Sequence, residues 1–212
     1  MNYSNLYSFF QNISAFSVVI PIGLCLIRFK YLNRVSILMF IYLIFSLLAE
    51  AFGAYVSTLL TSNSFVLDIF TLFELAFVVA MFLDFLKPKA GLKILFIGLT
   101  CLGYAFYIFG IILDNQILFN SFCALYLFGL SLFFIFNEDR ELNIPNLLQN
   151  YFYWYNVGFL IYFGTEFFLQ VFDDFIVSAK YHLGIYLYTI HLITNLILYA
   201  AISIGIWKTK ST

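Results

Sequence analysis

Four ionisable side chains lie inside long apolar stretches of this sequence. They are Glu50, Glu74, Glu166 and His191. Carboxyl and imidazole groups bind cations, exchange protons and act as general acids or bases. An ionisable group inside a membrane-spanning helix is costly, so it usually faces the interior of a bundle or a cavity. We therefore treat these four residues as the core of a candidate functional site.

Polar residues at helical spacing accompany two of the four. His191 and Asn195 are four residues apart, so they share one face of a helix. Tyr162 precedes Glu166 by one turn, and Gln170 follows it by one turn. Asn195 and Tyr162 therefore join the four as candidate ligand-binding residues.

Glu50 lies on a helical face whose other members are small or polar, which allows close approach of a second helix. These members are Ser46, Gly53 and Ser57. A tight polar turn predicted at 61–64 would let Glu74 meet Glu50. Two carboxylates that close cannot both stay ionised cheaply, so one of them would hold a proton.

The composition says what surrounds these groups. The chain has 212 residues, of which 64% are hydrophobic and only 10% charged, with a mean hydropathy of +0.99. Soluble domains carry roughly 25% charged residues and about half apolar ones. Lipid must therefore be the solvent for much of the chain. The net charge of −1 gives no indication of nucleic-acid binding.

The apolar segments predict an all-α, polytopic membrane protein. A bilayer core of about 30 Å needs about 20 apolar residues per helix. Seven segments satisfy that length within a single domain, residues 1–212. They are roughly 9–27, 35–60, 65–86, 91–113, 117–136, 151–171 and 184–207.

Lysine and arginine set the expected orientation, because cytoplasmic loops are enriched in them. One side collects Arg28, Lys30, Arg34, Lys87, Lys89, Lys93, Arg140, Lys208 and Lys210, whereas the other has only Lys180. We expect an N-out, C-in protein of the inner (plasma) membrane. The candidate residues then lie roughly 8–15 Å below the outer surface, at about 1.5 Å per residue.

Several kinds of chemistry lack their signatures in this sequence. The three cysteines form no CxxC or Cys/His spacing, so neither a zinc nor a redox motif is indicated. No GxSxG elbow and no phosphate-cradling glycine loop occurs. We therefore expect no cofactor. Three carboxylates and one imidazole could hold a hard divalent cation, but zinc normally takes more His or Cys.

The C-terminal third resembles a group of small seven-helix proteins of Bacteroidota-type bacteria. The resemblance covers mainly residues 150–210 and rests on the run YFYWYNVGFLIYFGTEFFLQVF followed by YTIHLITNLILYAAISIGIWK. Its marks are Tyr162-Phe163-Gly164, the His191/Asn195 pair and the closing Trp207-Lys208. This resemblance implies the seven-helix topology and connects the chain with sensory signalling, without naming an activity.

Better-known seven-helix families fit poorly. A microbial rhodopsin needs a lysine in the middle of its last helix, whereas Lys180 precedes this helix and Lys208 follows it, so we expect no retinal. The haemolysin-III-like hydrolases need paired histidines there, and the PQ-loop carriers need a Pro-Gln signature and a repeat. Lysoplasmalogenase-like proteins have a similar length and intramembrane acids, but their motif is not matched residue by residue.

Three functions remain open. We favour a receptor-like or sensory module with a polar pocket in the outer half, which signals through a cytoplasmic or membrane partner. The alternatives are a proton-coupled small-molecule transporter, with Glu50 and Glu74 as protonation sites, and an intramembrane hydrolase that is metal-dependent or lysoplasmalogenase-like. The enzyme is the least favoured.

A purely structural role is the competing interpretation for each polar group. A buried, protonated glutamate can simply bond a neighbouring helix, and Glu166 is near enough to a helix end to reach the interface. We expect Asp68 and Asp84, at helix ends, to be solvated. The charged run at 138–141 is expected to be a solvated loop that could also dock a partner.

Overall fold

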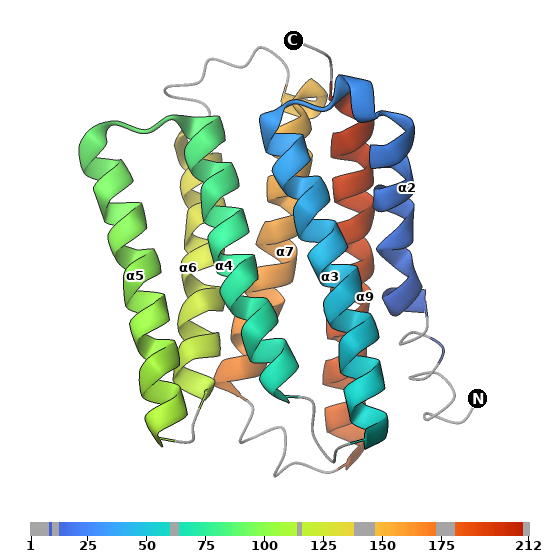
Figure 1. The fold of residues 1–212 in the computed structure, drawn as a ribbon, viewed down its shortest axis with the longest axis vertical. Coiled ribbons are helices and arrows are strands. Elements are labelled where there is room, and N and C mark those ends of the chain that lie inside the picture. The colour runs from blue at the N-terminus through green and yellow to red at the C-terminus, as the bar shows by residue number, and fades with distance from the viewer. Residues whose placement is uncertain are drawn as a thin grey trace.

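The computed structural model describes residues 9, 13–59, 64–113, 116–137, 147–172 and 181–209, and all regular structure within these ranges is helical. The long helices run up and down side by side (Figure 1). They are α2 (Val19–Ile27), α3 (Arg34–Leu59), α4 (Ser64–Leu86), α5 (Ala90–Leu113), α6 (Ile117–Asn137), α7 (Tyr151–Val171) and α9 (Tyr181–Lys208). Short 3-10 turns at Phe29–Tyr31 and Leu147–Gln149 precede α3 and α7.

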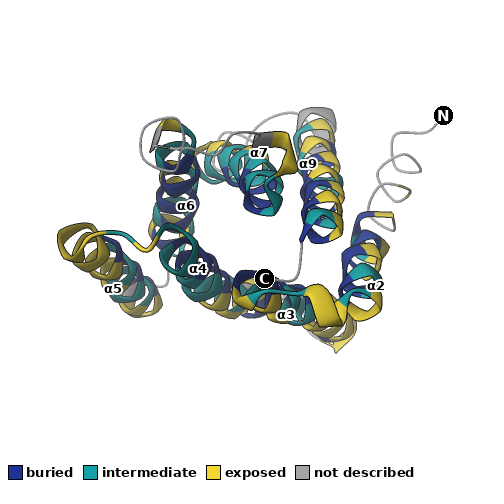
Figure 2. Ribbon diagram, turned by 90° about the horizontal axis from the view of Figure 1, so that it is seen from above, coloured by how far each residue is buried: buried dark blue, intermediate teal, exposed yellow. Residues whose placement is uncertain are grey.

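The helices form a ring with one helix outside it (Figure 2). α6, α7 and α9 pack in one row, and α3 packs against α4 in the facing row. α2 connects the rows by contacting α3 and α9, and α4 connects them by contacting α6. α5 lies outside, against α4 and α6. The two rows therefore face each other across the middle of the bundle.

The outer surface of the bundle is apolar. Large aliphatic side chains such as Ile27, Ile94 and Ile112 are 70–78% exposed, and many other Leu, Ile and Phe side chains accompany them. Exposed apolar area on this scale requires a lipid environment. The protein is a multi-pass helical membrane protein.

Within the described residues, five helices are long and apolar enough to cross a membrane. They are Arg34–Leu59, Phe65–Leu86, Ala90–Ile112, Ile117–Phe136 and Tyr186–Lys208. The first predicted span is a shorter apolar helix, Ile13–Ile27. The sixth, α7, has the length but not the hydropathy, because tyrosine, tryptophan, asparagine, glutamate and glutamine interrupt its apolar residues. Seven crossings therefore stay a prediction, although the helices agree closely with the seven segments.

The end where α4 and α6 finish and α7 begins is closely packed with aromatic rings. Phe82, Phe134, Phe152 and Tyr155 are fully buried there. Phe85 stacks on Phe152 with ring centroids 4.1 Å apart. Because such rings fill space at the density of a protein interior, this half of the bundle is closed.

Hydrogen bonds tie three helices together at the same end, which is the upper one in Figure 1. The Ser36 hydroxyl of α3 shares hydrogen bonds with the hydroxyls of Tyr155 on α7 (3.1 Å) and Thr209 after α9 (3.2 Å). Arg28 donates from Nη2 to the Thr209 carbonyl (2.8 Å). These contacts hold the C-terminal end of α9 against α3 and the turn that follows α2.

The basic residues predicted for one side do lie at one end of the bundle. Those within the described ranges are Arg28, Lys30, Arg34, Lys87, Lys89, Lys93 and Lys208, and all of them flank the upper helix ends. Arg140, Lys180, Lys210, Asp173 and Asp174, most of the turn at 61–64 and the charged run at 138–141 lie outside the described residues.

Candidate ligand-binding site

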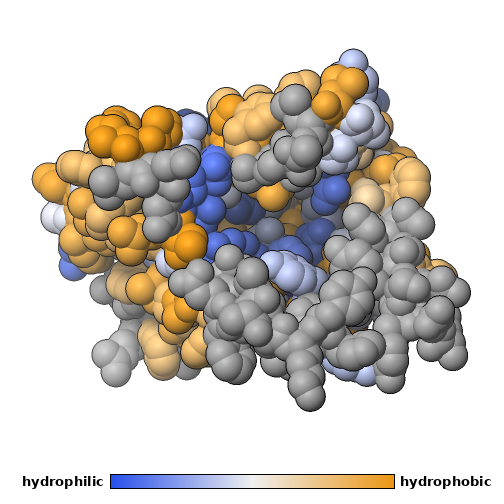
Figure 3. All heavy atoms as spheres, turned by 90° about the horizontal axis from the view of Figure 1, so that it is seen from below, coloured by the Kyte–Doolittle hydropathy of each residue, from blue (hydrophilic) through white to orange (hydrophobic). Residues whose placement is uncertain are grey.

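A polar hollow opens at the opposite, lower end of the bundle. Hydrophilic side chains gather in this hollow and are surrounded by apolar ones (Figure 3). It consists of two adjoining cavities of about 230 Å³ and about 400 Å³. Both are lined by Leu67, Phe70, Tyr162 and His191, so these side chains stand between them. We call the two cavities together the vestibule.

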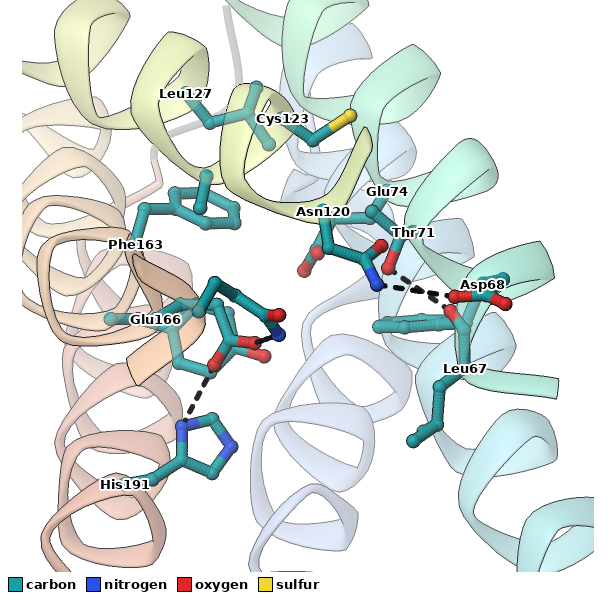
Figure 4. A pocket seen from close by; sticks show the side chains of 14 residues that line it. Leu67, Asp68, Thr71, Glu74, Asn120, Cys123, Leu127, Phe163, Glu166 and His191 are labelled. Atoms are coloured by element: carbon teal, nitrogen blue, oxygen red, sulfur yellow. Dashed lines mark hydrogen bonds and ion pairs between the residues drawn. The ribbon is translucent and has the colours of Figure 1, made fainter. Parts of the chain in front are cut away.

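The smaller one, which we call the acidic cavity, lies between the two rows of helices (Figure 4). Its polar side chains come from four helices: Asp68, Thr71 and Glu74 from α4, Asn120 from α6, Tyr162, Glu166 and Gln170 from α7, and His191 from α9. Tyr162, Glu166 and Gln170 share one face of α7 because they are four residues apart. That face cannot meet lipid, which agrees with the low hydropathy of α7.

Glu166 and His191 form an ion pair across α7 and α9. Their atoms Oε2 and Nδ1 are 3.1 Å apart, and each side chain is about a quarter exposed (25% and 26%). The contact does not have the geometry of a hydrogen bond, and it is an ion pair when the imidazole is protonated. Gln170 donates from Nε2 to Glu166 Oε1 (2.9 Å), and the Tyr162 ring lies 5.6 Å from the imidazole. Together these contacts orient the carboxylate at the cavity wall.

Glu74 faces the acidic cavity from the opposite wall. The residue is only 6% exposed, and Oε1 accepts a hydrogen bond from the Tyr42 hydroxyl of α3 (2.8 Å). The described residues provide no donor for its second carboxylate oxygen. Tyr42 therefore fixes the carboxyl group while leaving one acceptor available.

Asp68, which we expect to be solvated at a helix end, also lines this cavity and is partly buried there. Asn120 donates from Nδ2 to Asp68 Oδ1 (3.2 Å) and so links α6 with α4. The Asn120 carbonyl oxygen is buried and has no hydrogen-bond partner among the described residues. Asp84, at the other end of α4, pairs with Arg34 (3.4 Å).

The larger cavity, which we call the side cavity, contains Glu50 and Asn195. Asn195 donates from Nδ2 to the Ser14 hydroxyl (2.9 Å), and the hydroxyls of Ser46 and Tyr199 share a hydrogen bond (2.8 Å) that joins α3 to α9. Glu50 is exposed and lines only this cavity. Glu50 and Glu74 therefore line different cavities instead of contacting each other as expected, and Tyr162 and His191 lie between the two cavities.

All six candidate residues line the vestibule, but they divide between its two parts. Glu74 and Glu166 line the acidic cavity, Glu50 and Asn195 line the side cavity, and Tyr162 and His191 line both. Sequence reasoning did not include four further residues: Tyr42, Asp68, Thr71 and Asn120. The three-residue spacing of Asp68, Thr71 and Glu74 on one helical face was a readable signal, whereas Tyr42 and Asn120 carried none.

The geometry does not favour a metal ion. Among the described residues, no three His, Cys, Asp or Glu side chains are grouped so that they could hold one. The carboxyl groups instead line opposed walls, with Asp68 and Glu74 on α4 and Glu166 on α7 (Figure 4). Such a site offers several separated acceptors, which suits a molecule with positive charge or several donor groups more than a single ion.

No protein-family model, curated protein or solved structure matches the chain. The kinship with small seven-helix proteins of Bacteroidota-type bacteria therefore stays a prediction. The function has to be argued from the site alone.

Proposed function

We propose that the protein is a receptor-like membrane module that binds a small ligand in the vestibule. One observation carries this proposal: the acidic cavity is polar and opens at one end of the bundle, whereas the other end is closed by packed aromatic rings. A concave site with a few convergent polar groups among apolar ones is the usual form of a small-molecule site.

The closed end favours a receptor over a carrier. A carrier must open its site to the second face of the membrane, which would require separating Phe82, Phe134 and Phe152 and the Ser36–Tyr155 hydrogen bond. A receptor needs only a change at the open end. The ligand would touch α4 on one row and α7 on the other, so binding would draw the rows together.

The expected orientation gives the direction of the signal. Seven described basic residues flank the closed end, which under the positive-inside rule would face the cytoplasm of a bacterial inner membrane. The vestibule would then sample the outside. A movement of the helix rows would be passed to a cytoplasmic or membrane partner at the basic end.

The hydroxyl groups of the vestibule give less support to a hydrolase. Thr71 donates to the Leu67 carbonyl, Ser57 donates to the Ala54 carbonyl, and Ser46 bonds Tyr199. Within the described part of the chain, none of these hydroxyls is hydrogen-bonded to His191, as an activated nucleophile would be.

Filling the acidic cavity should abolish ligand binding. Ala124 of α6 lines this cavity and is 3% exposed, so Ala124→Phe would place a ring inside it. Its neighbour Leu125 is 48% exposed and points outward, which makes Leu125→Phe the matched control. The readout is the midpoint of thermal unfolding in lipid nanodiscs with ethanolamine, ethylene glycol or glycolate added singly.

We expect at least one of these probes to raise the midpoint for the wild type and for Leu125→Phe, and none to raise it for Ala124→Phe. The proposal of a ligand site fails if every probe acts equally on the filled variant, or if neither a probe nor phosphatidylethanolamine in the nanodiscs raises the midpoint of the wild type. If proteoliposomes accumulate a radiolabelled probe against its concentration gradient, the protein is a carrier and not a receptor.

A further inference from the structure

We infer that the ligand of the acidic cavity is a small primary ammonium ion. This inference rests on the proposed function, because it names the chemical class that the vestibule would take. Four features of the cavity carry it: its carboxyl groups, its unpaired acceptor, its aromatic wall and its size.

Most of the acidic and basic side chains in the cavity carry carboxyl groups. Asp68, Glu74 and Glu166 line it, and the only basic group among its described lining residues is His191, which lies against Glu166. Glu50 adds a fourth carboxyl group in the side cavity. Among the residues that the structure describes, neither cavity is lined by lysine or arginine. A concave site of one charge sign concentrates ligands of the opposite sign.

On the α4–α6 wall, the buried polar atom that lacks a partner among the described residues is an acceptor, the carbonyl oxygen of Asn120. The carboxyl group of Glu74, which Tyr42 bonds at Oε1, lines the same wall. A buried acceptor without a donor is costly, so the best ligand is one that supplies N–H groups. A primary ammonium has three of them, and its hydrogen bonds to carboxylates are strengthened by charge.

The remaining wall suits the rest of such a molecule. Phe70, Tyr162 and Phe163 present aromatic rings, which attract cations to their faces. Leu67 and Leu127 add aliphatic surface for a short carbon chain. The cavity volume of about 230 Å³ leaves room for a small molecule only. The ligand must therefore be small.

Two sources could supply this chemistry. A primary amine dissolved in water would enter through the open end. The ammonium head group of a membrane lipid would enter from the side, where an apolar groove between α3 and α4 shares Phe70 with both cavities and Ala49 with the side cavity. The ammonium group is common to both sources, and the composition of the surrounding lipid distinguishes them.

Four probes with one carbon skeleton test the inference by isothermal calorimetry on the protein in phosphatidylcholine nanodiscs. Ethanolamine carries a primary ammonium, choline a quaternary one without N–H groups, ethylene glycol a neutral hydroxyl and glycolate a carboxylate. We expect ethanolamine to bind about tenfold or more tightly than choline, and neither ethylene glycol nor glycolate to bind measurably.

Two substitutions locate the binding. Glu74→Gln keeps the shape and the acceptor for Tyr42 but removes the charge, so ethanolamine should bind about tenfold or more weakly. Asp84→Asn removes a carboxylate at the closed end, where it pairs with Arg34, and should leave the affinity unchanged. Equal weakening by both substitutions would overturn the assignment of the site.

The outcomes separate this inference from the proposed function. If ethylene glycol or glycolate binds and ethanolamine does not, the ammonium class is wrong while the ligand site stands. If no probe binds, and phosphatidylethanolamine in the nanodiscs does not raise the unfolding midpoint either, both fail. If phosphatidylethanolamine in the nanodiscs raises the unfolding midpoint and ethanolamine no longer binds in those nanodiscs, the lipid head group occupies the cavity.

Discussion

Replacing Gly205 with valine should destabilise the protein by about 3 kcal/mol. We expect this to be the largest effect of a valine substitution at any of the helical glycines. A Cβ atom at this position would overlap the Tyr155 ring and lie 2.8 Å from the Tyr151 carbonyl oxygen. The ring is held by packing and by Ser36, and the carbonyl belongs to the backbone of α7. The substitution must therefore push α9 away from α7, because neither neighbour can yield.

Valine at two other helical glycines provides the control. Gly98 on α5 and Gly129 on α6 have no atom within 4 Å of a built Cβ, so Gly98→Val and Gly129→Val should change the free energy of unfolding by about 0.5 kcal/mol or less. Unfolding by a denaturing detergent measures all three variants. A Gly205→Val protein as stable as these controls would show that α7 and α9 do not approach as closely as described.

Arg28→Ala should cost about 2–3 kcal/mol of stability. The guanidinium donates to the Thr209 carbonyl at 2.8 Å and lies over the rings of Trp207 (5.1 Å) and Tyr31 (5.4 Å). A hydrogen bond from a charged donor is worth about 1.5–3 kcal/mol, and exposed cation–π contacts add about 0.5–1 kcal/mol. Loss of these contacts should also free the C-terminal end of α9, which hydrogen exchange at residues 205–209 would detect.

Arg34→Ala is the matched comparison. Arg34 also carries a guanidinium at the closed end and pairs with Asp84 at 3.4 Å, but its side chain is 84% exposed. An exposed pair of this kind contributes about 1 kcal/mol at most. If the two substitutions cost the same, Arg28 does not anchor the end of α9, and the account of the closed end is wrong.

The helices could be predicted from the sequence because the bilayer imposes a length on apolar segments and breaks them at charged turns. Arg28, Lys30 and Arg34 end the first segment, and Lys87-Pro88-Lys89 ends the third, at the positions where α2 and α4 finish. The sixth segment shows the limit of that reasoning. α7 is as long as a membrane-spanning helix but less apolar. It packs between α6 and α9, so its polar face is compatible with burial in protein.

The site could be predicted only in part, because depth along a helix says nothing about rotation around it. Glu50 and Glu74 were placed at similar depths, yet they line different cavities. Glu74 is held instead by Tyr42, an interhelical contact that no spacing in the sequence reveals. Asp68 lines the acidic cavity because the cavity opens at the end of the bundle where α4 begins, which its position near a helix end did not reveal.

The most direct test of the central claim is the reactivity of single cysteines in lipid nanodiscs, where both membrane faces are open to water. In a background with Cys25→Ala, Cys101→Ser and Cys123→Ala, Thr71→Cys places a thiol in the acidic cavity, and Ser131→Cys places one in the closed half at 0% exposure. We expect rapid modification at position 71 by a charged, water-soluble methanethiosulfonate, faster for a cationic reagent than for an anionic one, and no modification at position 131. Equal reactivity at the two positions, or no reaction at position 71, would contradict a water-accessible acidic vestibule.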